Sequence, residues 1–296
     1  MRPWAEATVH VMSHALHYGS SVFEGVRLYG TPDGPRFFRL GCHSERLLQS
    51  ARIHRMEPDF DAQAIDRACH EVALSNDLPS AYLRPLIWRG LGAMGLDPTD
   101  SPVHTMVLGV EWGRYLGAAG LEEGIDVCVS SWSRPAPNTF PLLAKAGGQY
   151  IAATTMLMEA KRNGFAEAIA LNTNGTVSEG SGENLFLVKD GVLYTPGWSD
   201  SILMGITRHS VITMARAAGL VVEERPLPRE MLYVADEVFL TGTAAEITPV
   251  RSVDRIPIAG GGPGPITRAM QQGFFGLFDG TEEDRHGWLS APGEEP

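Results

Sequence analysis

The chain has 296 residues, of which 44% are hydrophobic, enough to bury one large core or two medium ones. Its net charge of −11 argues against nucleic acid as a main partner, because contact with a phosphate backbone needs a basic face. Three cysteines lie far apart, and neither a secretory signal nor an apolar run of membrane-spanning length is visible. We therefore expect a soluble cytoplasmic protein that contacts no membrane and has neither a disulfide framework nor a zinc ribbon.

The first part of the chain, up to residue 112, mixes strand and helix patterns. Apolar residues at helical spacing predict helices over 43–54 and 61–76, the second with Asp61 as its N-cap. Small residues at 113–120 predict a flexible connection to a second domain. Apolar runs predict strands, the last two of them buried, at 37–40, 81–88 and 103–111.

The second part of the chain alternates strands with two helices. The helices are predicted over 148–162, closed by Asn163-Gly164, and over 206–218, ended by Gly219. The strands are predicted at 125–130, 167–172, 176–179, 185–188, 192–195, 221–224 and 236–241. This succession favours an α+β protein of two lobes with a cleft between them. We expect a small N-terminal domain at 1–112, an interdomain loop at 113–124 and a large domain at 125–296.

Lysine is scarce, since only three of the 24 basic residues are lysines. Lys189 lies in a predicted hairpin turn, and Lys161 lies in the last turn of a predicted helix, where a cation complements the helix dipole. Lys145 instead lies among apolar and small residues just before that helix. We expect desolvation there to lower the pKa of Lys145 and make it a nucleophile. From this context alone, a lysine whose stem lies along a strand end is an equally good explanation.

Two further patterns fit the same chemistry. Residues 178–184 place two acids around a small-residue turn, and a carboxylate beside a pyridine nitrogen keeps that nitrogen protonated. The segment 205–207 opens a helix whose free N–H groups can hold a phosphate, and 241–245 can form a second backbone nest. Each pattern alone is also typical of a polar turn or an ordinary helix cap. Together they indicate an amine, an acid and a phosphate site.

From His10 to the C-terminus the chain resembles fold-type-IV aminotransferases, specifically the bacterial branched-chain amino acid aminotransferases. The family usually begins with a further strand before the segment matched by His10, where only nine residues precede here. We therefore expect either a misassigned start or a small domain that lacks an edge strand. The stretches that carry the resemblance cover nearly the whole chain: 11–19, 21–25, 136–139, 145–148, 178–186, 242–250 and 271–278.

The resemblance implies pyridoxal 5′-phosphate as the cofactor, held in the large domain. Lys145 would bind it covalently and then move the proton between the substrate α-carbon and the cofactor C4′ carbon. Glu179 would partner the pyridine nitrogen, and Tyr150 would hydrogen-bond the 3′ oxygen. The residues implied for the phosphate are Arg46, Ile206, Thr207, Gly242 and Thr243.

The resemblance also implies transfer of an amino group between L-leucine, L-isoleucine or L-valine and 2-oxoglutarate. Tyr82 and Arg84 match a family signature, and residues two apart on a strand face the same way, so Arg84 can meet the glutamate side-chain carboxylate. The Thr243 hydroxyl and the Ala244 amide would hold the α-carboxylate. The residues implied for the apolar pocket are Phe23, Trp112, Tyr115 and Tyr150.

Tyr18 resembles a residue that reaches in from a neighbouring subunit, so a homodimer or a dimer-based hexamer is implied. His10, His14 and His17 have the spacing of a metal site on a helix, but no carboxylate or cysteine joins them nearby, and we expect no metal. The chain has neither a P-loop nor a G-x-S-x-G motif.

Two classes of alternative function remain. One is a sister enzyme of the same fold: a D-amino-acid or (R)-amine transaminase, an aminodeoxychorismate lyase or a specialised biosynthetic transaminase. The other is a binding protein without catalysis. The Tyr82-x-Arg84 pair disfavours the D-amino-acid transaminase, the (R)-amine transaminase and the lyase, but it leaves a specialised biosynthetic transaminase open. The binding protein is disfavoured by the joint presence of Lys145, Glu179, Arg46 and Thr243. The sequence leaves open the preference among leucine, isoleucine and valine, and a biosynthetic or catabolic role.

Overall fold

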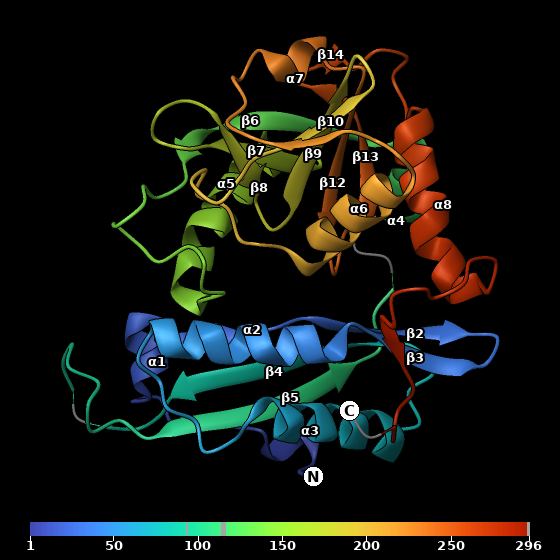
Figure 1. Ribbon diagram of the computed structural model, residues 1–296. Coiled ribbons are helices and arrows are strands. Elements are labelled where there is room, and N and C mark those ends of the chain that lie inside the picture. Colours follow the sequence, from blue (N-terminus) through green and yellow to red (C-terminus); the bar gives the residue numbers. More distant parts are fainter. Residues whose placement is uncertain (93, 114–116, 295–296) are drawn as a thin grey trace. The chain divides into compact units, whose positions relative to one another are not determined.

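The computed structural model describes residues 1–92, 94–113 and 117–294. The chain divides into two compact units (Figure 1). Unit 1 comprises Met1–Trp112, Ala144–Tyr150 and Asp284–Pro296, and unit 2 comprises Gly113–Leu143 and Ile151–Glu283. Both units combine helices with a sheet, which confirms the α+β class.

Unit 1 is built on an antiparallel sheet with β4 at its centre (Figure 1). One edge of β4 pairs first with β2 and then with β1, and its other edge pairs along its whole length with β5. The strands are β1 (Ser21–Phe23), β2 (Val26–Thr31), β3 (Gly34–Phe38), β4 (Ala81–Arg89), β5 (Val103–Val110) and β15 (Leu289–Ser290). Because β4 pairs on both edges, its register is strongly fixed.

Helices α1 (His14–Tyr18), α2 (Leu40–Ile53) and α3 (Ala62–Ser75) belong to unit 1, as do the short 3₁₀ helices η1 (Trp4–Glu6) and η2 (Gly147–Gln149). The predicted N-cap of α3 is confirmed, since the Asp61 side chain accepts a hydrogen bond of 2.8 Å from the Ala64 amide. Helix α3 buries Ile65, Cys69 and Val72, residues at helical spacing that face the sheet.

The prediction that 103–111 is a buried strand is wrong in one respect. The strand exists as β5, but none of its residues is fully buried. Within the part of the chain that the structure describes, β5 pairs only with β4 and therefore forms an edge of the sheet. The prediction of a strand at 37–40 also ends too late, because Leu40 is already the first residue of α2.

Unit 2 contains a mixed sheet in the order β11-β10-β9-β12-β13-β6-β7-β8, with β14 beside β13. The predicted hairpin of β9 and β10 is confirmed, and the predicted strands at 167–172 and 176–179 form the antiparallel pair β7 and β8. The strands are β6 (Ile125–Ser133), β7 (Glu167–Leu171), β8 (Val177–Gly180), β9 (Asn184–Lys189), β10 (Val192–Thr195), β11 (Val222–Glu224), β12 (Glu237–Gly242), β13 (Glu246–Val253) and β14 (Ile256–Pro257).

Helices α6 (Ile206–Ala217) and α8 (Pro265–Asp279) pack beside each other against β12 and β13 (Figure 1). Helix α5 (Tyr150–Arg162) buries Met156 and Ala160 against Ala168 of β7. The remaining helices of unit 2 are α4 (Gly117–Glu123) and α7 (Met231–Val234). No helix among the described residues has the length and apolar character needed to cross a membrane.

Two segments that the sequence interpretation assigned to the second domain lie in unit 1. Residues 144–150 join it because Ala146 bridges to Val22, next to β1, and residues 284–296 join it because β15 pairs with β3. Of the expected flexible connection at 113–120, residues 114–116 lie outside the described residues, and residues 117–120 begin helix α4. Contacts between residues far apart in the sequence decide the placement of the two segments in unit 1.

We expect Asp61→Ala to lower the free energy of unfolding by about 1 kcal/mol, because α3 loses its side-chain N-cap. Urea denaturation followed by circular dichroism measures this change. Asp59→Ala is the matched control, because Asp59 is an exposed acid just before the same helix. Equal stability losses in the two variants would contradict the capping role.

Candidate active site

The backbone of Lys145 is fixed on two sides within unit 1. Its amide donates a hydrogen bond of 3.0 Å to the Ser50 hydroxyl of α2, and its carbonyl accepts one of 3.0 Å from the Phe23 amide. The neighbouring bridge between Val22 and Ala146 extends this pairing with β1. Helix α2 and strand β1 therefore set the direction in which the Lys145 side chain leaves the backbone.

The amine of Lys145 lies among aromatic groups. Its Nζ donates to the Tyr150 hydroxyl at 2.7 Å and lies 5.0 Å from the centre of the Phe23 ring. The Phe23 and Tyr150 rings are 4.8 Å apart between centroids. Lys189 by contrast pairs with Asp236 at the surface, and Lys161 lies exposed at the end of α5. Of the three lysines, only Lys145 lies in such a preorganised environment.

The expected lowering of the Lys145 pKa is wrong. Burial alone lowers the pKa, but Tyr150 and the negative charge of Glu24 outweigh burial and raise it above the ordinary value. The amine is therefore protonated at neutral pH in the chain as it stands. The hydroxyl of Tyr150, five residues further on, accepts a hydrogen bond from this amine.

Glu24 is a buried acid beside the predicted site residue Arg46, and the sequence analysis did not single it out. Its fully buried carboxylate accepts hydrogen bonds from Arg46 Nε at 2.6 Å, from Arg46 Nη2 at 2.9 Å and from His43 Nδ1 at 2.7 Å. Burial alone raises the pKa of Glu24, but Arg46 and His43 hold it far below the usual range. The signal in the sequence was an acid inside the run Val22–Val26.

The predicted substrate residues of unit 1 lie together. Arg84 donates a hydrogen bond of 3.2 Å to the Tyr82 hydroxyl and stacks 4.4 Å from the centre of the Phe23 ring. The Tyr82 and Trp112 rings meet edge to face, 4.5 Å apart. A Cβ atom on Gly25 would lie 1.8 Å from the Tyr82 hydroxyl, so the absence of a side chain there gives Tyr82 its position.

Tyr18 ends α1 and packs its ring 4.6 Å from His14, with its outer face partly exposed. Tyr115 lies outside the described residues. The three histidines engage separate partners: His14 the Ser20 hydroxyl, His10 the Met12 amide and His17 the Val11 carbonyl. Among the described residues no three histidine, cysteine or acidic side chains are grouped closely enough to hold a metal ion.

In unit 2, Glu179 is buried and bonded through both oxygens. Its Oε1 lies 2.5 Å from Nη2 of Arg134, which is itself buried. Its Oε2 accepts hydrogen bonds of 2.9 Å from the Asn184 side-chain amide and 3.0 Å from the Leu203 backbone amide. Donors on both oxygens favour the charged carboxylate over the neutral acid. Arg134 and Asn184 were not singled out in the sequence.

The predicted phosphate residues of unit 2 lie at two strand and helix ends. Ile206 and Thr207 form the buried first turn of α6, after Gly205 as its N-cap. Gly242, Thr243 and Ala244 lie at the turn from β12 to β13. The hydroxyl of the preceding Thr241 is buried and has no hydrogen-bond partner within the described chain.

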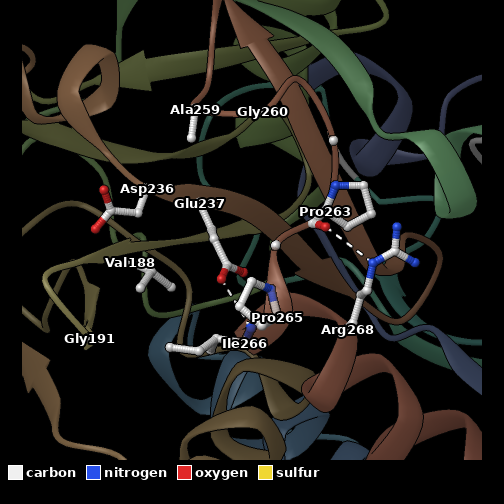
Figure 2. Close-up of a pocket in the computed structure, with 12 residues that line it drawn as sticks. Val188, Gly191, Asp236, Glu237, Ala259, Gly260, Pro263, Pro265, Ile266 and Arg268 are labelled. Atoms are coloured by element: carbon white, nitrogen blue, oxygen red, sulfur yellow. Dashed lines mark hydrogen bonds between the residues drawn. The ribbon is translucent and has the colours of Figure 1, made fainter.

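A pocket of about 550 Å³ lies elsewhere in unit 2, lined by the glycine-rich loop 259–264 and the start of α8 (Figure 2). Its buried acid, Glu237, accepts hydrogen bonds from the Ile266 and Thr267 amides and so caps α8 (Figure 2). The acid is therefore engaged in holding the helix. No residue predicted for the active site lines this pocket.

Residues 21–253 match the family described as amino-transferase class IV. The chain belongs to this family. A branched-chain-amino-acid aminotransferase of Escherichia coli strain K12 is 53% identical to it, covering 97% of this chain and 93% of that protein. One from Pseudomonas aeruginosa is 43% identical, with 96% and 92% covered. The resemblance inferred from the sequence is thus confirmed.

Solved structures of class IV aminotransferases agree with this fold. A branched-chain amino acid aminotransferase from Escherichia coli matches with a TM-score of 0.97 at 52% identity, covering 99% of this chain and 96% of that one. Another, from Thermobaculum terrenum and solved in its pyridoxal-phosphate form, matches with a TM-score of 0.92 at 35% identity, covering 99% and 96%.

We expect Glu24→Gln to destabilise the protein by about 3 kcal/mol at pH 7, because Arg46, whose side chain is only 12% exposed, loses its charged partner. The pKa of Glu24 is lower in the folded chain than in the unfolded one, so its stabilisation is present above pH 4.5, the ordinary value, and is lost as the pH falls further. The difference in the free energy of unfolding between variant and wild type should therefore become smaller below that pH.

Urea titrations at pH 7, 5 and 4 measure this difference. Glu45→Gln is the control, because Glu45 lies on the same helix as Arg46 but is exposed. A difference that stays constant or widens towards pH 4 would show that the ionised Glu24 is not the source of the stability.

Proposed function

We propose that this class IV aminotransferase transfers the amino group between L-leucine, L-isoleucine or L-valine and 2-oxoglutarate, with pyridoxal 5′-phosphate bound to Lys145. The names of the relatives, which match this chain over nearly its whole length, support the substrate class and the cofactor. The observation that carries the residue assignment is the placement of the Lys145 amine, the only one of three lysines held against both a phenol and aromatic rings.

The residues present fit this cofactor. Taken by itself, unit 1 contains an amine and a largely buried arginine. Taken by itself, unit 2 contains a buried carboxylate, a buried hydroxyl without a partner among the described residues, and a helix start with buried Thr207. Glu179 would hold the proton of the pyridine nitrogen. Arg46, Ile206, Thr207, Gly242 and Thr243 would hold the phosphate. When bound, the cofactor supplies an electron sink for the bond broken at the substrate α-carbon.

The protein's own part in the proton transfer lies with Lys145 and Tyr150. The Tyr150 hydroxyl accepts a hydrogen bond from Nζ, which fixes the amine in one direction. We propose that Lys145 takes up the α-proton and returns it on the neighbouring carbon. Burial lowers the pKa of this amine, but Tyr150 and Glu24 raise it above the ordinary value, so the amine binds a proton more strongly than an ordinary lysine does.

The proposed substrate pocket must accept an apolar side chain in one half-reaction and a carboxylate in the other. Phe23, Tyr82, Trp112 and Tyr150 would supply the apolar wall. Tyr115, which the resemblance also implies for it, lies outside the described residues. Arg84 lies against that wall and is held by Tyr82, and no acid among the described residues of unit 1 pairs with its charge. The Thr243 hydroxyl and the Ala244 amide would hold the α-carboxylate.

We further propose a homodimer, alone or as the unit of a hexamer, in a cytoplasmic location. Support comes from exposed apolar residues on both sides of the bridge between Ser13 and Leu91. The buried free thiol of Cys69 suits a reducing compartment. The exposed apolar side chains include Val11, Leu16, Tyr18, Leu91, Met94 and Leu96.

The purified protein is expected to be yellow, to bleach with L-leucine and to regain its colour with 2-oxoglutarate. Lys145→Ala should abolish bleaching at ordinary rates, because the chain offers no second amine in that environment. Absorbance spectroscopy of single half-reactions checks this.

Lys161→Ala and Lys189→Ala are matched controls and should react like the wild type. Bleaching by D-alanine but not by L-leucine would favour the D-amino-acid transaminase instead. A colourless protein that takes up no cofactor would contradict both transaminase assignments.

Arg84→Ala should raise the KM for L-glutamate about 10- to 100-fold and change that for L-leucine much less, because only glutamate presents a second carboxylate. Steady-state kinetics with both amino donors measures the split. Arg36→Ala is the control, since Arg36 lies on β3 and donates to the neighbouring Pro35 carbonyl. An equal rise in KM for leucine and for glutamate in Arg84→Ala would show that Arg84 does not determine the specificity for glutamate.

A further inference from the structure

We propose that Asn184 is a positioning residue that locks the Glu179 carboxylate to the start of α6, so that unit 2 recognises both ends of one ligand as a rigid pair. The inference rests on the proposed function, in which Glu179 faces the ring nitrogen and α6 faces the phosphate. Asn184 is the first residue of β9 and is buried. It lies four residues beyond the end of β8, which carries Glu179.

Both hydrogens of the Asn184 amide group are used. Nδ2 donates to Glu179 Oε2 at 2.9 Å and to the Leu203 carbonyl at 2.8 Å. The Leu203 amide in turn donates to the same Glu179 oxygen at 3.0 Å. The three groups close a triangle, so the carboxylate cannot move without moving the segment that leads into α6.

Gly205 brings the helix start against the same amide. A Cβ atom on Gly205 would lie 1.9 Å from Asn184 Oδ1. The backbone of Gly205 is extended, with φ at −68°, which any residue can adopt. Glycine is therefore needed at this position for space, because Asn184 packs directly on the residue before Ile206 and Thr207.

Arg134 fixes the other side of the acid to the same segment. It pairs with Glu179 Oε1 at 2.5 Å, and its Nε donates to the Ser201 carbonyl at 3.3 Å. Ser178, next to Glu179, also donates to the Ser201 carbonyl. Both oxygens of the acid are thus tied to residues 201–203. Asn184 adds a direct link, because it bonds the acid and also packs against Gly205, the N-cap of α6.

A rigid link of this kind has a thermodynamic consequence. A ligand that bears both a pyridine nitrogen and a phosphate gains from the fixed separation, because the protein loses no freedom in bringing the two groups to their places. A ligand with only one of these ends gains nothing from it. Loss of the link should therefore weaken pyridoxal 5′-phosphate selectively.

The test is equilibrium binding to the full chain, freed of cofactor, followed by quenching of tryptophan fluorescence. The ligands are pyridoxal 5′-phosphate, pyridoxal and inorganic phosphate. Asn184→Ala should bind pyridoxal 5′-phosphate about 10-fold or more weakly, with pyridoxal and inorganic phosphate each within about 3-fold of the wild type. Gly205→Ala should give the same pattern, because its Cβ atom presses on Asn184 from the other side, and it serves if Asn184→Ala does not fold.

Asn172→Ala is the matched control. Asn172 is a buried asparagine of unit 2 whose side chain donates to Thr176 and accepts within the turn 172–176, so all three ligands should bind as in the wild type. Equal weakening of all three ligands in Asn184→Ala, or unchanged affinity for pyridoxal 5′-phosphate, would overturn the proposal. A wild-type chain that binds no pyridoxal 5′-phosphate would overturn the proposed function itself.

Discussion

The buried carboxylate of Glu24 is the group on which the arrangement of unit 1 depends. Three nitrogen-bearing side chains gather near it: the guanidinium of Arg46, the imidazole of His43 and the amine of Lys145. Arg46 alone would lower the pKa of Lys145, and burial lowers it further. Glu24 and Tyr150 outweigh both effects, so the pKa of Lys145 lies above its ordinary value. An isolated charge would be too costly to bury, so the four groups are stable only as a set.

Unit 2 also buries a carboxylate against an arginine, here on strand β8. The carboxylate of Glu179 is buried against Arg134 and completed by an asparagine and a backbone amide. In both units a buried acid is held by arginine and further nitrogen donors rather than by solvent. The low-dielectric surroundings strengthen each of these contacts. Preorganised charges of this kind are the usual source of catalytic stabilisation.

Local patterns in the sequence were enough to predict many elements. The N-cap at Asp61, the β9–β10 hairpin and the Tyr82–Arg84 pair all depend on residues within a few positions of one another. The errors came from long-range contacts. The α8 start was not predicted, since its cap, Glu237, lies 28 residues before Pro265. The predicted direction of the Lys145 pKa shift was wrong because the apolar residues next to Lys145 in the sequence do not indicate that Glu24 lies near its amine.

The pairing of β4 on both edges limits how this enzyme can change over evolution. Tyr82 and Arg84 share a face because the strand runs unbroken between two neighbours. An insertion or deletion of one residue there would turn both side chains to the opposite face and unpair the sheet. Exchanging the side chains of Tyr82 and Arg84 can therefore change the proposed substrate pocket while the length and pairing of β4 are kept.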